Sequence, residues 1–289
     1  MKDVTQFIPM KIDLHMHSTV SDGRLSPKDV MTLAHENGVQ VVSLTDHDTM
    51  DGTHLAQRTA ESLGMHFIPG VEVSTQWGGR VIHVVGLGMD AESAVVENFF
   101  RDVCLKRDRR GRAIGEKLEA LLGIKDAYTK ALALADNKDN LSRTHFARML
   151  FEEGYVKTYQ EAFDRFLSSS KPCCVNIDWP TLAEVVELIH GAGGVAVVAH
   201  PGRYLYREEW MREALMNDFK ALGGDAIEVI SGSQSSEENL YWAQVCRQMG
   251  FLASCGSDFH SLSGSRPMPG CQGQLPQDLV PVWRILKWN

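Results

Sequence analysis

The chain has 289 residues, of which 44% are hydrophobic and 23% charged, and its formal net charge is −8. This length suits one α/β barrel or two smaller domains, and the composition excludes a disordered or fibrous chain. The acidic balance argues against a non-specific nucleic-acid binder but allows a local basic pocket. No apolar run approaches the roughly 18–20 residues of a membrane-spanning helix, so no membrane association is expected.

The first ten residues lack a basic start followed by an apolar stretch, so we expect no secretory signal and a cytoplasmic location. The six cysteines are scattered without a C-x-x-C motif, which indicates reduced thiols rather than a disulfide framework. No stable protein partner is predicted.

The first part of the chain alternates between predicted strands and helices. Residues 11–15 form a short strand, and Ser26 then caps a helix that has Pro27 at its first position and Gly38 after its end. The pattern next predicts a strand at 41–45, a helix at 53–63, and strands at 67–74 and 81–88.

From residue 92 to about 166 the chain is charged, with apolar residues at helical spacing and no clear strand. We interpret 92–175 as a helical insert that caps the substrate site and interrupts one domain formed by 1–91 and 176–289. The alternation resumes with helices at 182–190, 208–222, 237–249 and 278–287 and strands at 195–199, 226–230 and 252–257. Such alternation predicts an α/β fold with a parallel sheet, either closed as a barrel or left open.

Histidine and acidic residues gather near the predicted strands, mostly at their carboxyl ends, where parallel α/β folds place their active sites. In chain order they are His15, His17, Asp22, Asp46, His47, Asp48, Glu72, His83, His200, Asp258 and His260. Each fragment alone has a structural reading, as packed histidines, a capping turn or a buried ion pair. Their recurrence in register with the strands indicates a metal site.

Two histidine-containing pairs, His15/His17 and Asp258/His260, have i, i+2 spacing, which points both side chains to one side of an extended chain. Imidazole mixed with carboxylate suits Mn²⁺, Fe²⁺ or Zn²⁺, whereas Mg²⁺ alone would favour an all-oxygen site. Asp46 and Asp48 are candidates for orienting histidine ligands from behind, and Glu228 for a core or supporting role.

These motifs resemble the PHP (polymerase and histidinol phosphatase) family over nearly the whole chain, the insert included. The similarity is greatest to the bacterial 3′,5′-nucleoside bisphosphate phosphatases, which are also described as 5′→3′ exoribonucleases. It is carried by His15-x-His17, Ser21-Asp22-Gly23, Thr45-Asp46-His47-Asp48-Thr49, Pro69-Gly70-Val71-Glu72, His83, His200-Pro201-Gly202-Arg203-Tyr204 and Gly256-Ser257-Asp258-Phe259-His260.

The resemblance implies a distorted (β/α)7 barrel, the PHP fold, with two or three divalent ions, manganese foremost and iron or zinc as alternatives. One ion would be held by His15, His17, Glu72 and Asp258. Glu72 would bridge to a second ion completed by His83 and His200. A third would be held by Asp22, His47 and His260.

Bound cations lower the pKa of water and neutralise phosphoryl oxygens, so we expect a metal-bound water as the nucleophile and assign none to the protein. Four cationic residues stand out in this acidic chain as candidates for contacting a phosphate: Arg143, Arg148, Lys171 and Arg203. The resemblance implies that such residues hold a 5′-phosphate. For each of them a role as an ordinary solvated side chain stays open.

The implied reaction removes the 3′-phosphate of nucleoside 3′,5′-bisphosphates such as 3′-phospho-5′-AMP. The same O3′–P bond, broken at the 5′ end of short 5′-phosphorylated RNA, gives a 5′→3′ exoribonuclease, for example one that trims ribosomal RNA. A histidinol-phosphate-type phosphatase and a non-catalytic metal-binding module are the alternatives.

Overall fold

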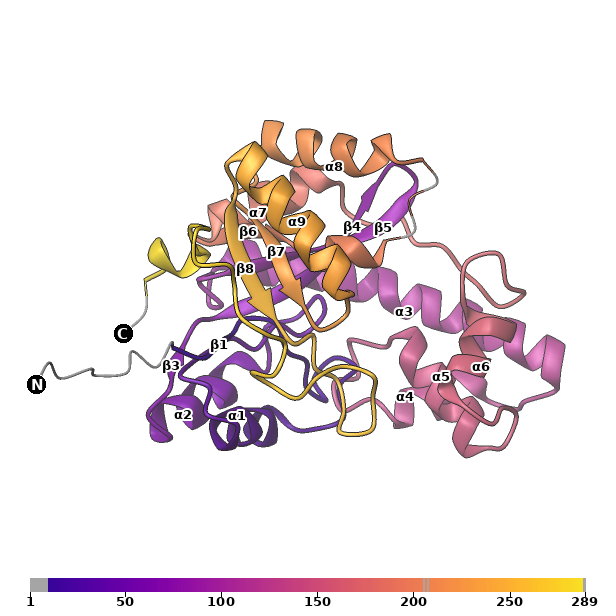
Figure 1. The fold of residues 1–289 in the computed structure, drawn as a ribbon. Coiled ribbons are helices and arrows are strands. Elements are labelled where there is room, and N and C mark those ends of the chain that lie inside the picture. Colours follow the sequence, from indigo (N-terminus) through magenta and orange to yellow (C-terminus); the bar gives the residue numbers. More distant parts are fainter. Residues whose placement is uncertain (1–9, 205, 207, 288–289) are drawn as a thin grey trace, which may run out of the picture.

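The computed structural model describes residues 10–204, 206 and 208–287 and has an α/β fold (Figure 1). Its strands are β1 (Ile12–Asp13), β2 (Val41–Val42), β3 (His66–Phe67), β4 (Gly70–Trp77), β5 (Arg80–Leu87), β6 (Val195–Val198), β7 (Ala226–Ser231) and β8 (Leu252–Gly256). Its helices are α1 (Pro27–Glu36), α2 (Thr53–Ser62), α3 (Ala94–Leu122), α4 (Ala127–Ala133), α5 (Arg143–Glu152), α6 (Tyr159–Ala162), α7 (Leu182–Gly191), α8 (Trp210–Ala221) and α9 (Ser236–Met249). Short helical turns lie at η1 (Phe163–Leu167), η2 (Pro201–Arg203) and η3 (Val282–Arg284).

The strands form two sheets, one in the order β1-β2-β3 and one in the order β4-β5-β6-β7-β8. The first sheet is parallel, as predicted, and so are the pairs β6–β7 and β7–β8. The prediction of an all-parallel sheet is wrong for β5, which runs antiparallel to both β4 and β6. The cause is a tight turn at Gly78 and Gly79, whose positive φ angles of 55° and 73° join β4 and β5 as a hairpin without a crossover helix.

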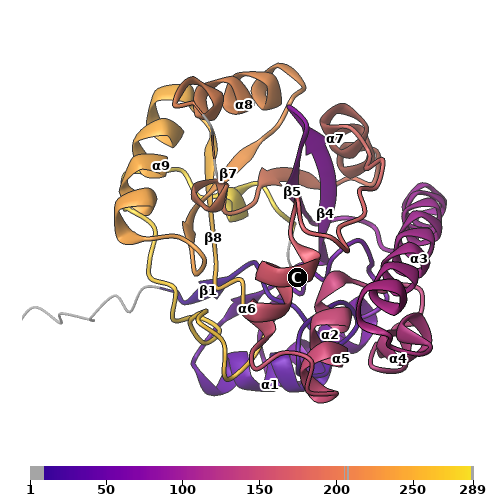
Figure 2. The same ribbon diagram turned by 90° about the vertical axis from the view of Figure 1, so that its right-hand side faces the viewer.

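Two isolated bridges link the sheets at both ends. Met16, just after β1, pairs with Phe259, just after β8, and His47, after β2, pairs with Glu72 on β4. The pairing therefore runs around a ring, and Figure 2 shows the strands around a common centre with the insert helices in front of them. This arrangement is compatible with the expected distorted barrel.

Local sequence signals set the ends of several elements. Ser26 accepts a hydrogen bond from the backbone of Asp29 and caps α1, and Gly38 follows the helix at a φ of 78°, as expected. The predicted helix at 278–287 is wrong: only the turn η3 forms there. Pro281 prevents a helix from passing through it, and this stretch instead runs beside β8 through a bridge to Ala253.

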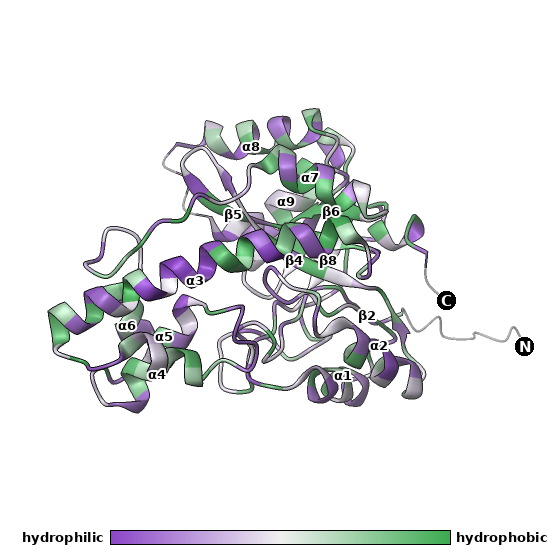
Figure 3. Cartoon of the chain, turned by 180° about the vertical axis from the view of Figure 1, so that it is seen from behind, coloured by the Kyte–Doolittle hydropathy of each residue, from purple (hydrophilic) through white to green (hydrophobic). Residues whose placement is uncertain are grey.

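Helix α3 connects two hydrophobic clusters. Val96 and Phe100 near its start pack into the core of the strands, whereas Ile114 and Leu118 belong to a separate cluster formed by residues 114–175. Between them α3 is largely hydrophilic, as Figure 3 shows. Within the described ranges, no helix combines the length and the apolar character needed to cross a bilayer.

Candidate functional site

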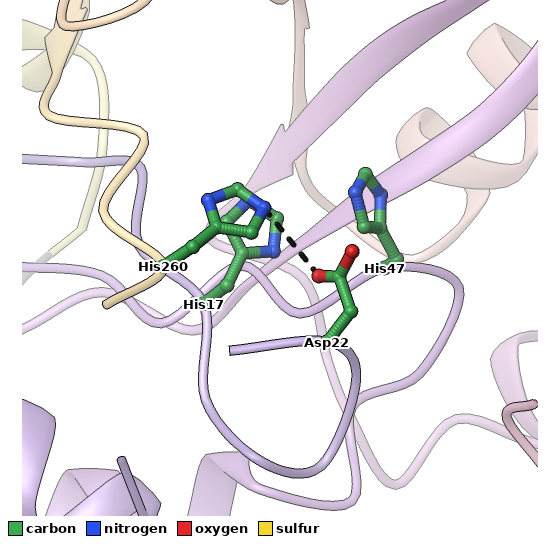
Figure 4. A group of neighbouring side chains, drawn as sticks. All are labelled: His17, Asp22, His47 and His260. Atoms are coloured by element: carbon green, nitrogen blue, oxygen red, sulfur yellow. Dashed lines mark ion pairs between the residues drawn. The ribbon is translucent and has the colours of Figure 1, made fainter. Parts of the chain in front are cut away.

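The predicted metal-binding side chains all converge at one place. They fall into overlapping groups whose ligand atoms lie within 4.8 Å of one another, namely His17/Asp22/His47/His260, His15/His17/Asp258, His15/Glu72/His200 and His47/Glu72/His83. We call these nine residues the histidine–carboxylate cluster. Figure 4 shows the first group, with His260 and Asp22 facing each other at 3.4 Å.

This grouping differs in several places from the partition that the family resemblance implies. Glu72 does not group with His17 and Asp258, and His83 and His200 fall in different groups. His17 joins Asp22, His47 and His260, and His200 groups with His15 as well as with Glu72. Because His15, His17, His47 and Glu72 each belong to two groups, the cluster can hold neighbouring ions that share ligands.

Glu72 lies at the centre of the cluster and is fully buried. Its Oε1 is 2.9 Å from His83 Nδ1 and 2.8 Å from His200 Nε2. Its Oε2 is 3.0 Å from His47 Nδ1. Burial alone would raise the pKa of Glu72, but the facing histidines, His47 and His83 foremost, hold it well below the ordinary value. Glu72 is therefore an anion, the form in which a carboxylate can bind a metal ion.

Several buried nitrogen and oxygen atoms of the cluster make no hydrogen bond. They are His15 Nε2, both ring nitrogens of His17, Asp22 Oδ1, His47 Nδ1, Glu72 Oε2, His200 Nδ1 and Asp258 Oδ1. Unsatisfied buried polar atoms are costly and therefore rare. Imidazole nitrogen and carboxylate oxygen at this density form a donor set that fits divalent cations.

Two histidines of the cluster, His47 and His17, have pKa values shifted in opposite directions because their surroundings differ. Burial lowers the pKa of His47 to about 3 and keeps its ring neutral, the form that binds metal. Burial also disfavours the charged form of His17, but contacts with Asp258 and Glu72 outweigh it and raise that pKa to about 9. A cation in the cluster would take over the role of the proton on His17.

Three cluster or neighbouring residues have strained backbones. Asp48, His200 and Asp258 adopt positive φ angles of 51°, 30° and 52°, a conformation that non-glycine residues seldom adopt. Such strain concentrates at functional sites, where the surrounding structure enforces it. At all three positions it follows the end of a strand and turns the chain at the cluster.

The two aspartates predicted to orient histidines instead accept hydrogen bonds from serine residues of neighbouring segments. Asp46 accepts hydrogen bonds from the Ser18 backbone at 2.7 Å and the Ser21 hydroxyl at 2.5 Å, and so fixes the loop that carries Asp22. Asp48 accepts from the backbone and hydroxyl of Ser74 at 2.6 and 2.8 Å. Neither carboxylate contacts an imidazole ring in the hydrogen bonds of the described residues.

Other supporting groups come from distant parts of the chain. Glu228 on β7 lies 2.9 Å from His15 Nδ1, so it can fix the ring with Nε2 facing the cluster. Arg266, in a loop without any motif, donates to Asp258 Oδ2 at 2.8 Å. Sequence reasoning considered Glu228 but missed Arg266, and no local signal marks it.

The insert reaches the cluster at three points. Thr144 Oγ1 donates to Asp22 Oδ2 at 3.1 Å, and Asn140 Nδ2 donates to the carbonyl of His47 at 2.5 Å. Arg107 on α3 is buried and pairs with Asp48. None of these three insert residues was predicted from the sequence.

The four predicted cationic residues lie in different environments. Arg203 lies 3.7 Å from Asp258 Oδ2 and is 45% exposed, at the edge of the cluster. Arg143 is half-buried and donates to the carbonyl of Leu167. Arg148 is bonded to Glu152 at 2.6 Å, and Lys171 is exposed in the turn after η1.

A further arginine, which the sequence did not single out, lies among these cations. Arg110 on α3 is buried, and both it and Arg107 lie over the Trp179 ring. Burial and the neighbouring guanidinium groups of Arg107 and Arg143 lower the pKa of Arg110 well below the usual value. The Asp48 carboxylate opposes this shift, but within the described residues the Arg110 side chain makes no ion pair.

The model of the PHP domain matches residues 13–232. The chain belongs to the PHP domain family. The matched part of this PHP chain contains seven cluster residues, and Asp258 and His260 follow it on the segment after β8.

Two relatives match the PHP chain over nearly its full length. A 5′-3′ exoribonuclease of Haemophilus influenzae is 39% identical and covers 94% of this chain and 98% of its own. A 3′,5′-nucleoside bisphosphate phosphatase of Chromobacterium violaceum is 40% identical and covers 96% of both chains. A solved structure from C. violaceum, described as an amidohydrolase with bound sulfate and no metal, is 40% identical, has a TM-score of 0.89 and covers 95% of both chains.

Proposed function

We propose that this PHP chain is a metal-dependent phosphoesterase that removes the 3′-phosphate of nucleoside 3′,5′-bisphosphates. We further propose that it breaks the same O3′–P bond at the 5′ end of 5′-phosphorylated RNA, acting as a 5′→3′ exoribonuclease. The observation that carries the proposal is the convergence of nine ligand-type side chains. The buried Arg110, which makes no ion pair within the described residues, adds a cation for a phosphate. The names of the two relatives, one for each activity, support it.

The metal ligands in this proposal are the nine cluster residues, and manganese is the proposed ion, with iron or zinc as alternatives. Bound cations would supply an activated water and neutralise phosphoryl oxygens. Glu72 would be a central ligand of these ions, Glu228 would orient His15, and Arg266 would orient Asp258. The cation Arg203, at the edge of the cluster, is placed to contact a phosphoryl oxygen.

Arg110 and Arg143 are the proposed contacts of the substrate's 5′-phosphate. The neighbouring guanidinium groups of Arg107 and Arg203 each lower the pKa of Arg143, and burial lowers it further. A phosphate dianion would compensate these buried charges through charge-assisted hydrogen bonds. In this scheme residues 92–175 form the cap that reads the nucleotide, and the barrel holds the metals. The proposed location is the cytoplasm.

Histidinol phosphate is the second candidate substrate, and it lacks a second phosphate. The buried Arg110 favours a substrate with one phosphate at the metals and another at the insert. A purely structural metal site would be closed by protein ligands, whereas here the cationic Arg203 remains 45% exposed beside Asp258.

The test compares kcat/KM of manganese-loaded protein on a nucleoside 3′,5′-bisphosphate, the corresponding nucleoside 3′-monophosphate, a 5′-phosphorylated oligoribonucleotide and histidinol phosphate. We expect the bisphosphate and the RNA to be preferred, and activity to vanish when EDTA removes the metal. Turnover that is insensitive to EDTA, or a preference for histidinol phosphate, would refute the proposal.

The variant Arg110→Gln tests the phosphate contact. It should raise KM for the bisphosphate and leave KM for the 3′-monophosphate unchanged, because only the former has a 5′-phosphate. The matched control is Arg109→Gln, an exposed arginine on the neighbouring position of α3. An equal effect of Arg110→Gln on both substrates would exclude this role.

A further inference from the structure

The first turn of α5 separates two groups of side chains. Arg143 is near enough to Arg107 and Arg203 for their charges to lower its pKa, although burial lowers it most. Thr144 and His145 instead line a cavity together with Asp22, and Thr144 donates to the Asp22 carboxylate at 3.1 Å. Successive helical residues are rotated by about 100°, which places 144 and 145 away from 143. The proposed 5′-phosphate contacts therefore lie on one side of α5, and a second surface lies on the other.

A small cavity of about 20 Å³ lies on this second side. Its lining includes Asp22 of the cluster, Arg24, Asp136 and Arg148. Arg148 is bonded to Glu152 at 2.6 Å, so Arg24 is the cation in the lining that remains free to pair with a ligand. Asp22 belongs to both the cluster and this lining, so the cavity adjoins the proposed reaction centre.

The buried imidazole of His145 provides a hydrogen-bond donor in this cavity. His145 is 7% exposed, and its Nδ1 accepts from the backbone of Ser142 at 3.0 Å. Because Nδ1 accepts this bond, the proton of the ring is on Nε2. No described group accepts from Nε2, which leaves the proton for a ligand.

Two aromatic rings continue the surface beyond the cavity. Phe151 on α5 and Tyr159 on α6 are 40% and 37% exposed, and their ring centroids are 4.9 Å apart. The guanidinium of Arg24, from the cavity, lies over the Tyr159 ring at 4.9 Å. Helices α5 and α6 lie side by side in the insert (Figure 1). We call Phe151 and Tyr159 the aromatic platform.

We propose that the cavity and the aromatic platform bind the nucleotides that follow the scissile phosphate in a single-stranded RNA. Arg24 and the Nε2 proton of His145 would contact the next phosphate, and a base would stack on the platform. This inference rests on the proposed function and assigns its RNA activity a surface of its own. A nucleoside bisphosphate has no such nucleotides and leaves this surface empty.

The chemistry favours single-stranded RNA over a duplex or a folded protein as the occupant. Exposed aromatic rings beside an arginine form the usual platform for unpaired bases, whose faces are hidden in a duplex. A ligand that extends from Asp22 past Arg24 to Tyr159 would have only one of its ends at the reaction centre. The 5′ terminus of an RNA strand can bind in this way.

The variant Tyr159→Ala separates this surface from the reaction centre. With manganese-loaded protein, we expect kcat/KM for a 5′-phosphorylated hexaribonucleotide to fall roughly tenfold or more, the effect of losing one base–aromatic stack. The kcat/KM for the nucleoside bisphosphate should not change. Tyr159→Phe keeps the ring and should restore activity on RNA. Trp210→Ala, which removes a 64% exposed ring on α8, is the matched control.

The outcomes distinguish this inference from the proposed function. If the wild type cleaves both substrates and Tyr159→Ala changes neither or changes both equally, the inference is wrong and the proposed function stands. If the wild type cleaves the bisphosphate but not the RNA, the inference and the RNA activity both fail. If the wild type cleaves neither, the proposed function itself is refuted.

Discussion

The two carboxylate oxygens of Asp22 face different parts of the molecule, one the cluster and the other the insert. Its Oδ1 faces His260 Nε2 at 3.4 Å and makes no hydrogen bond, while its Oδ2 accepts from Thr144 Oγ1 at 3.1 Å. A hydrogen bond to one carboxylate oxygen keeps the other aimed at a metal. Thr144, on α5, therefore fixes the orientation of a cluster residue that lies on the segment after β1.

We expect Thr144→Ala to weaken the binding of one ion roughly ten- to hundredfold, the usual effect of losing such support, and to leave the other ions unaffected. Calorimetric titration of chelated protein with Mn²⁺ measures this. Thr144→Ser retains the hydroxyl and should restore affinity, and Thr129→Ala, at an exposed position of α4, is the control. Identical titrations for wild type and Thr144→Ala would contradict the assignment.

His145 makes the stability of the fold depend on pH. Its pKa is about 4 in the folded chain, against an ordinary value of 6.5, because burial disfavours the charged ring. Between these values the unfolded chain binds a proton that the folded chain does not. The free energy of unfolding therefore falls as the pH drops from 6.5 towards 4.

His145→Gln should remove this dependence. Glutamine at the third helical position can still accept from the Ser142 backbone and complete the capping box, and it does not titrate. Between pH 7 and pH 5, metal-free wild type should lose about 2 kcal/mol more stability than the variant. Urea unfolding at both pH values measures the difference, and parallel losses would show that His145 is protonated in the folded chain.

The sequence predicted the cluster residues because each of them lies in or just after a strand or in the loop that follows it. Side chains at i, i+2 spacing, such as His15 and His17, point to the same side of a strand. They form a candidate metal site when a neighbouring strand brings similar side chains close to them. Arg266, Thr144 and Arg110 carry no such signal. Their contacts with Asp258, Asp22 and Trp179 depend on how distant segments pack, which one sequence does not reveal.

Among the elements, α3 has the largest role in joining insert and barrel. It starts in the core of the strands and ends in the hydrophobic cluster of the insert. Midway, Arg107 is 4% exposed, lies over Trp179 and pairs with Asp48 beside His47. The pairing and Ser74 together keep the buried Asp48 charged, with its pKa below the ordinary value despite burial.

Arg107→Ala should destabilise the fold by about 3 kcal/mol or more, because it leaves the Asp48 carboxylate buried without its cation. Arg109→Ala, two residues further along α3 and exposed, should change stability little. Thermal unfolding of both variants measures the difference. A loss that is equal in the two variants would mean that helix propensity, rather than the buried pair, is responsible.

Elements that depend on local signals were predicted well, and elements that depend on tertiary pairing were not. Helix α1 follows from Ser26, Pro27 and Gly38. The direction of β5 was wrong because a strand's apolar pattern is the same in either direction. The segment 278–287 shows helical apolar spacing, but Pro281 and the pairing with Ala253 override it.

At the scale of the whole molecule, the cluster lies where every part of the chain meets. The nine side chains come from strands β4 and β5 and from the segments that follow β1, β2, β6 and β8. The insert contacts Asp22, His47 and Asp48. The sequence predicted the α/β class and the helical insert. It did not predict these contacts, since they require the insert to fold back over the strands.

Metal binding should therefore stabilise the insert as well as the barrel. Chelation leaves buried atoms of the cluster without partners, so we expect a lower melting temperature. Saturating Mn²⁺ should restore stability by about 4 kcal/mol at a thousandfold excess over Kd.

Hydrogen exchange with and without EDTA locates the effect. Amides at 18–24 and 137–145 should exchange faster after chelation, because Thr144 and Asn140 then hold a cluster segment that no ion fixes. Helix α8, which contributes no cluster residue, is the internal reference. Faster exchange at 18–24 with no change at 137–145 would show that the insert keeps its place without the metals. In that case, the contacts of Thr144 and Asn140 would not couple metal binding at the cluster to the stability of the insert.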